Sequence, residues 1–146
     1  MATDWYPSQE GRIADGLTIN CVAETAVAEG DCVKFGTSTS GQITVVPATA
    51  HGDAFGIGIR AAAAGLPVPV LVYGLYKCIN STVSATPLQG HACMNYANAA
   101  VSDVDDLAVV EAVSIAFSGD CIILGMLMQT GTAAADELLV LVGKCI

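Results

Sequence analysis

The feature that most constrains the fold of this chain is a phrase that its sequence uses twice. Each copy has a short apolar stretch that contains glycine, then a run of alanines, then a longer aliphatic stretch that ends at a glycine. The first copy covers residues 56–74 and the second covers residues 125–143. A further echo places Gly-Asp-Cys-Val at 30–33 and Gly-Asp-Cys-Ile at 119–122, each upstream of one copy. Two copies of one β-unit favour a pseudo-symmetric barrel or sandwich, because a solenoid needs about three or more repeats to bury a continuous core.

Short apolar runs separated by turn residues continue through the rest of the chain, as in an all-β domain. The 146 residues suit one domain that buries about two thirds of its unfolded surface. We therefore predict an all-β fold, a small compact β-barrel or sandwich of pseudo-repeated β-units over residues 16–146. A polar, extended N-terminal arm precedes it over residues 1–15. Residues 107–117 leave strand and helix open, because an aspartate before them could cap a helix while four β-branched residues favour a strand.

Local patterns predict individual strands and turns. Residues 17–21 alternate with the period of a half-buried strand. Residues 32–35 and 42–46 flank a polar tip and predict a hairpin. Gly56 and Gly58 stand together in an apolar stretch, which predicts a bend or a close backbone approach.

The composition predicts contacts with other protein chains. Hydrophobic residues make up 53% of the chain and charged residues 13%, so there are too few polar groups to cover a monomer in the usual way. The apolar runs are interrupted or far shorter than the ~20 residues of a transmembrane helix, so we predict no membrane span. Fourteen acidic and five basic residues give a net charge of −9, which opposes binding to nucleic acid and to anionic lipid.

Two segments are candidates for binding a partner. The N-terminal arm holds the single tryptophan of the chain, and an aromatic residue in a polar segment often anchors that segment to a neighbour. Two prolines near residue 68 cannot donate to a β-ladder, which predicts that residues 68–72 form an edge strand or are paired on one side only. The candidate partner-binding residues are therefore Trp5, Tyr6, Pro67, Val68, Pro69 and Val70.

No pattern of residues points to catalysis, and we predict that the protein is not an enzyme. Residues 117–119 lack the first glycine of a nucleophile elbow, and there is no phosphate loop, dinucleotide fingerprint or His-Glu-x-x-His motif. His51 and His91 each stand beside a glycine, as turn histidines do. The aspartates at 103–106 lack the glycine and the distal glutamate of a calcium loop. We expect no cofactor and no metal.

The six cysteines leave two states open. Cys21, Cys32, Cys78, Cys93, Cys121 and Cys145 contain no Cys-x-x-Cys pair and lie at no zinc-ligand spacing from the histidines. The first residues lack the basic start and apolar core of a signal peptide, so we expect synthesis in a cytoplasm and reduced, buried thiols. Three disulfides formed after release into an oxidising medium are the alternative. Asn80-Ser81-Thr82 meets the N-glycosylation rule, a weak hint because such triplets often arise by chance.

Several stretches resemble the small capsid decoration, or cement, proteins of tailed bacteriophages and related archaeal viruses. They are Glu-Gly-Asp-Cys-Val at 29–33, Gly-Asp-Ala-Phe-Gly-Ile-Gly at 52–58 and the segment 64–74, with 125–142 similar to the closing strands of the family. The likeness covers about residues 21–142 and lies in glycine and aliphatic patterning, not in a signature motif. The family has a compact β-barrel that adds to the outside of an assembled capsid, commonly as trimers, and no catalytic residues carry over. The six cysteines and the aromatic arm depart from its pattern.

The resemblance implies a viral structural protein that decorates and stabilises a capsid. Its implied partners are the major capsid protein and further copies of itself, as a trimer, and its implied location is the virion surface after synthesis in the host cytoplasm. Two alternatives stay open. One is a self-assembling subunit of another assembly, such as an extracellular filament or a capsid protein proper, that exchanges a strand or an arm. The other is a sugar-binding or hydrolytic β-domain, which the small number of aromatic residues disfavours.

Overall fold

The computed structural model of the protein describes residues 16–38, 41–81, 87–96, 98–103, 123–131 and 137–143. The predictions for the arm with Trp5 and Tyr6, for residues 107–117, and for Cys121 and Cys145 lie outside the described residues. The strands are β1 (Leu17–Ala23), β2 (Cys32–Phe35), β3 (Thr44–Pro47), β4 (Gly56–Gly58), β5 (Pro67–Ile79), β6 (Ala92–Tyr96), β7 (Ala100–Asp103), β8 (Gly125–Leu127) and β9 (Glu137–Val142). The fold is all-β, as predicted. Among these residues, no helix has the length and hydrophobicity needed to cross a membrane.

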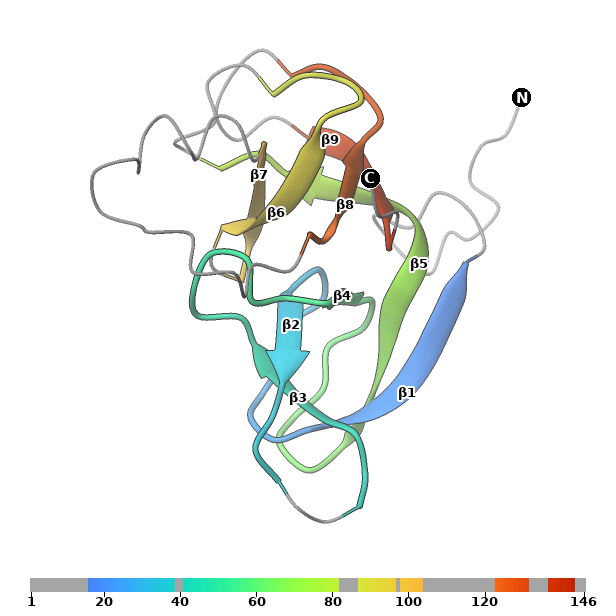
Figure 1. Ribbon diagram of the computed structural model, residues 1–146. Helices are drawn as coiled ribbons and strands as arrows, with labels where there is room; N and C mark the ends of the chain where they lie inside the picture. The colour runs from blue at the N-terminus through green and yellow to red at the C-terminus, as the bar shows by residue number, and fades with distance from the viewer. Residues whose placement is uncertain are drawn as a thin grey trace.

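The first half of the chain forms a closed five-stranded barrel, which occupies the lower half of Figure 1. Its strand order is β1-β3-β2-β4-β5, and β1 pairs again with β5 to close the ring. The β1–β3 pairing is parallel and the others are antiparallel. The predicted strand at residues 17–21 and the predicted β2–β3 hairpin are both confirmed.

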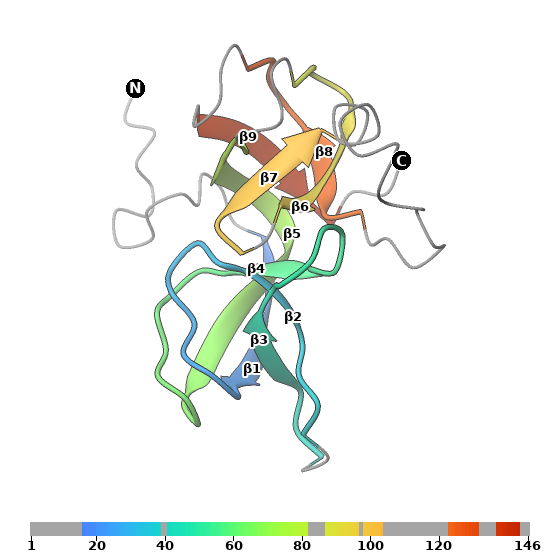
Figure 2. The ribbon, with the colours of Figure 1, turned by 90° about the vertical axis from the view of Figure 1, so that its left-hand side faces the viewer.

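The second half repeats this arrangement, and β5 belongs to both halves (Figures 1 and 2). From Gly74 onward β5 pairs with β9, and β8, β6 and β7 follow in order. A parallel bridge between Asn80, just after β5, and Val101 of β7 brings the last strand of this order back beside β5. The order β5-β7-β6-β8-β9 matches β1-β3-β2-β4-β5, including the one parallel contact. One β-unit is therefore used twice, and the last strand of the first unit is the first strand of the second.

The strand registers support this equivalence residue by residue. In the first unit Val33 of β2 lies opposite Gly56 of β4, and in the second unit Cys93 of β6 lies opposite Gly125 of β8. The parallel contacts of the two units agree as well. After β1, the N–H of Glu24 donates to the carbonyl of Val45 on β3 at 2.9 Å, and after β5, the N–H of Ser81 donates to the carbonyl of Val101 on β7 at 2.8 Å. The predicted correspondence of residues 56–74 with residues 125–143 is confirmed.

The predicted upstream echo is wrong. The N–H of Gly30 donates to the carbonyl of Gly58 at 2.7 Å, and the N–H of Gly90 donates to the carbonyl of Leu127 at 2.8 Å. Both turn glycines have a positive φ, +87° and +89°. The counterpart of residues 30–33 is thus 90–93, at the start of β6, and not the segment at 119–122.

The predicted close backbone approach at Gly56 is confirmed, and it recurs in the second unit. A Cβ on Gly56 would lie 2.7 Å from the carbonyl oxygen of Leu71 on β5. A Cβ on Gly125 would lie closer still to the carbonyl oxygen of Leu141 on β9. Since Leu141 is the counterpart of Leu71, both units need glycine at the same place for the same reason.

The predicted edge strand at residues 68–72 is wrong. Here β5 pairs with β1 on one side and with β4 on the other. The prolines are tolerated because the carbonyl of Pro69 accepts a hydrogen bond from the N–H of Ile59 at 3.1 Å, just beyond the end of β4. In a strand, the N and O atoms of one residue point to the same side. The nitrogen atoms of Pro67 and Pro69, which carry no hydrogen, therefore point to the side of β4 but lie beyond its last paired residue, where no ladder hydrogen bond is lost.

One hydrophobic core cluster spans both barrels. It contains Ile57 and Leu71 from the first barrel and Leu127 and Val140 from the second, all of them fully buried. A smaller cluster of mainly valines fills the far end of the first barrel. The two units therefore pack through a shared core.

Candidate interaction surface

Seven large apolar residues are more than 40% exposed in the part of the chain that the structure describes. They are Leu17, Phe35, Ile43, Leu66, Tyr73, Ile79 and Leu88. Three of them gather at the end of the first barrel that lies away from the second barrel. We call Phe35, Ile43 and Leu66 the apolar rim. Their exposed fractions are 58%, 48% and 54%.

Backbone contacts bring the members of the apolar rim together. The carbonyl of Ile43 accepts from the N–H of Val22 at 2.9 Å, and the carbonyl of Leu66 accepts from the N–H of Ala23 at 3.0 Å. Ile43 and Leu66 thus lie on either side of the end of β1. Phe35 ends β2, whose neighbour β3 begins just after Ile43.

The alternation of side chains explains why the rim is apolar in sequence. Each rim residue stands two positions from a fully buried core valine, because Phe35 follows Val33, and Ile43 and Leu66 precede Val45 and Val68. Residues two apart in a strand point to the same face. The rim side chains therefore continue the inner face of the barrel beyond its last packed layer, where it meets solvent.

The rim is held in place by its neighbours. The ring of Phe35 stacks on that of Phe55, with centroids 4.1 Å apart and planes 9° apart. The carboxylate of Glu24 accepts hydrogen bonds from the N–H of Thr37 at 2.7 Å and from the hydroxyl of Thr44 at 3.3 Å. A Cβ on Gly36 would collide with that carboxylate, so glycine is required for this bracing.

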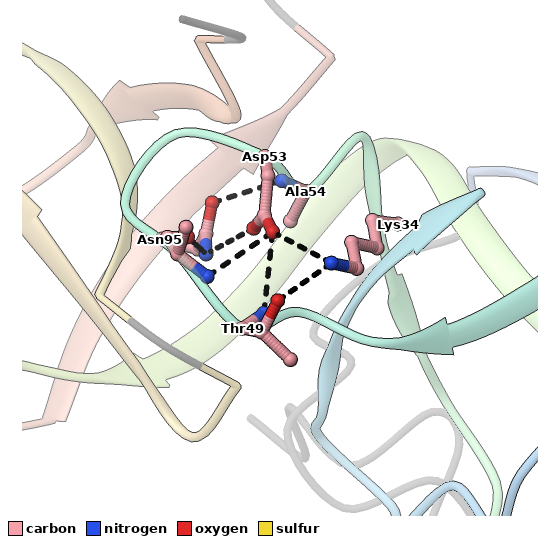
Figure 3. Close-up of polar contacts among 6 residues, drawn as sticks. Lys34, Thr49, Asp53, Ala54 and Asn95 are labelled. Atoms are coloured by element: carbon pink, nitrogen blue, oxygen red, sulfur yellow. Dashed lines mark hydrogen bonds and ion pairs between the residues drawn. The ribbon is translucent and has the colours of Figure 1, made fainter. Parts of the chain in front are cut away.

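A buried polar cluster lies between the barrels and is centred on Asn95 of β6 (Figure 3). Its Oδ1 accepts from the N–H of Ala54 at 2.9 Å, and its Nδ2 donates to the carbonyl of Ala50 at 2.8 Å and to Asp53 Oδ1 at 3.0 Å. Asn95 is fully buried. The cluster ties the loop between β3 and β4 to the second barrel.

Asp53 organises the same loop. Its Oδ2 accepts from the N–H groups of Thr49 and Ala50 at 3.2 and 3.1 Å, and lies 3.4 Å from Lys34 Nζ. Lys34 in turn donates to the hydroxyl of Thr49 at 2.5 Å. These contacts use the carboxylate to fix the backbone, so the cluster acts as a joint between the barrels.

The cysteines that the structure describes are buried thiols: Cys21, Cys32, Cys78 and Cys93. Burial raises the pKa of Cys32 to about 12, and the negative charges of Asp31 and Asp53 add to the shift. Burial also raises the pKa of Cys78, which lies close to Cys32 and Cys93. Cys32 and Cys78 therefore stay protonated at neutral pH and pack as small hydrophobic groups, which is one of the two states that the sequence left open.

The structure separates the predicted partner-binding residues. Val68 and Val70 are fully buried in the first barrel, whereas Pro67 is exposed and Pro69 is half-buried. Of these four residues, only the prolines have surface to offer a partner. Binding through Pro67, Pro69 or the arm stays a prediction.

Other predicted features have simple places in the fold. Asn80 is 1% exposed, so its amide is closed to glycosylation in the folded chain. His51 lies in a turn, with its ring 4.6 Å from that of Tyr96. Within the described ranges, no group of three or more His, Cys, Asp or Glu side chains is placed to hold a metal ion.

Comparison with protein-family models and with curated proteins finds no match. Among solved structures, the chain is similar to the head fiber gp8.5 N base in bacteriophage phi29. The TM-score is 0.53 at 11% sequence identity, over 86% of this chain and 92% of that chain. At this identity the likeness shows a shared fold.

Proposed function

We propose that this protein is a structural protein of a virus particle, and that it decorates and stabilises the outside of an assembled capsid. The observation that carries the proposal is the fold, which this chain shares over most of its length with a phage head fiber protein. The glycine and aliphatic patterning that resembles capsid decoration proteins supports the same class. The apolar rim gives such a protein a surface for subunit contacts.

The mechanism we propose is thermodynamic. A protein that binds the assembled shell but not the free subunits stabilises the shell by mass action. Burying ~400 Å² of apolar surface per subunit contributes on the order of 10 kcal/mol before the cost of association offsets most of it. Small net gains repeated at many sites add up over a shell. The proposed partners are the major capsid protein and further copies of this chain, most simply as a trimer, at the virion surface, with no catalytic step.

Particles that carry this protein should survive heating or chelation that opens particles lacking it. The measurement is the release of packaged nucleic acid, followed by dye fluorescence, from matched particles with and without the chain. Adding the purified protein back to bare particles should restore the higher opening temperature. Equal opening temperatures for decorated and bare particles would rule out the stabilising role.

A second candidate is a subunit of a fibre mounted on the particle. It is favoured by the structural neighbour, which is the base of a phage head fiber. Electron microscopy of labelled particles separates the two, because a decoration protein forms a layer of compact densities whereas a fibre subunit lies at the base or along the shaft of a projection.

A further inference from the structure

We propose that the apolar rim of the first barrel is the surface on which a second copy of this chain docks. The inference deepens the proposed function, because it names the self-contact that a multi-subunit decoration protein would use. Three features of the molecule support it, namely the internal repeat, the distribution of charge and the rigidity of the rim.

The internal repeat provides a built-in comparison. Phe35 lies opposite Val45 in the first unit, and Asn95 lies opposite Val101 in the second, so Asn95 is the counterpart of Phe35. Ile43 stands two residues before Val45, as Ala99 stands two residues before Val101.

The two units differ in what covers this end. Asn95 is fully buried because it bonds to the loop between β3 and β4, so the corresponding end of the second unit is covered within the chain. In the first unit Phe35 and Ile43 are 58% and 48% exposed. An apolar end that is covered in one unit and left open in the other points to an interface.

Charge identifies the occupant as another copy. The chain has a net charge of −9, so two copies repel each other unless they meet where charges are absent. The two segments that bear most of the rim, residues 36–44 and 61–67, contain no charged residue. The nearby Glu24 is half-buried and directs its carboxylate to Thr37 and Thr44. An uncharged apolar patch on an acidic chain suits a neighbour of the same charge.

The rim is also prepared for binding before a partner arrives. Phe35 is stacked on Phe55, and Glu24 fixes the start of the loop that leads to Ile43. Side chains that are already ordered lose less conformational entropy on association. Phe35 also fits such a surface by its type, because aromatic residues are enriched in the cores of protein interfaces.

The test measures self-association of the full chain by sedimentation velocity over a concentration series. Phe35→Ser and Leu66→Ser should each raise the dissociation constant of the oligomer about tenfold or more. Leu17→Ser and Tyr73→Ser are matched controls, because both residues are at least half exposed but lie outside the rim, and they should change it less than twofold. Circular dichroism verifies that each variant is folded.

A second pair of variants changes charge at the rim without removing an apolar side chain. Gln42 is exposed on the uncharged loop, and Gln42→Glu should weaken self-association, more strongly at low salt, whereas Gln42→Lys should not. A monomeric wild-type chain, or rim variants that associate like the wild type, would overturn the inference. Rim variants that keep their oligomer but lose binding to particles would also overturn it, because the rim would then face the capsid.

The outcomes for the inference and for the proposed function can be told apart. Rim variants that become monomeric yet still bind particles support the rim as the self-contact. A chain that associates through the rim but binds no particle also supports the rim inference, while it contradicts the proposed decoration of capsids.

Discussion

Replacing Gly125 with alanine is expected to lower the free energy of unfolding by about 3 kcal/mol, and replacing Gly56 should have a similar effect. In each case the new methyl group meets a backbone carbonyl, that of Leu141 or Leu71, which cannot move aside as a flexible side chain can. The strands must then separate, at the cost of ladder hydrogen bonds. Urea denaturation followed by circular dichroism measures the change.

Gly41→Ala is the matched control for this pair. Gly41 has a φ of +81°, and a Cβ there would meet nothing within 4 Å. Its replacement costs only the backbone strain of a left-handed residue, about 1 kcal/mol. If Gly125→Ala were no more destabilising than Gly41→Ala, the close approach of β8 to β9 would be wrong, and with it the equivalence of the two units.

Replacing Asn95 with leucine is expected to lower the free energy of unfolding by about 3 to 5 kcal/mol. The change removes the amide that pairs with the N–H of Ala54 and the carbonyl of Ala50. Each buried group left without a partner costs about 1 to 3 kcal/mol. Asp53 also loses the donor at 3.0 Å that faces its Oδ1.

The control for Asn95 is a second amide on the surface. Gln129 is exposed, and its Nε2 donates to the carbonyl of Glu137 at 3.4 Å, so Gln129→Leu should change stability by less than about 0.5 kcal/mol. Comparable stabilities of the Asn95→Leu variant and the wild type would mean that the joint between the barrels does not depend on this cluster.

The sequence predicted the repeated unit because glycine and aliphatic residues recur where the strand pairing demands them. Gly56 faces Leu71 and Gly125 faces Leu141, at spacings that differ by a single residue, and this near-equal spacing can be read in the sequence. The upstream echo misled because a Gly-Asp-Cys match at 119–122 outweighed the weaker Gly-His-Ala-Cys at 90–93. The true counterpart is fixed by the pairing of β6 with β8. That pairing joins segments far apart in the chain, so a local sequence match does not reveal it.

The position of β5 could not be predicted from its prolines. A proline removes one hydrogen bond of the ladder, at its own residue and on one side of the strand. Whether the sheet needs that bond depends on where the neighbouring strand ends. Here β4 ends at Gly58, so Pro67 and Pro69 fit inside a strand with partners on both sides. The sequence also gave no sign that one strand would serve two barrels.

The apolar rim and the polar joint were missed for different reasons. Phe35, Ile43 and Leu66 alternate in phase with buried valines, so the sequence pattern makes them indistinguishable from core residues. Only the end of the barrel exposes them. Asn95 stands in an apolar strand with no local motif, and its partners lie more than 40 residues away in sequence. One signal was available, since aligning the two units places a polar residue of the second opposite an aromatic residue of the first.

The most direct test of the proposed function is to count this protein in purified virus particles. Particles banded in a density gradient, from lysates in which the chain is produced, are analysed by quantitative mass spectrometry against the major capsid protein, before and after protease treatment of intact particles. We predict a constant ratio to the major capsid protein across gradient fractions and preparations, with loss of the chain when the outside of the shell is digested. Absence of the chain from every particle fraction, or its presence only after the shell is opened, would contradict a protein of the capsid surface.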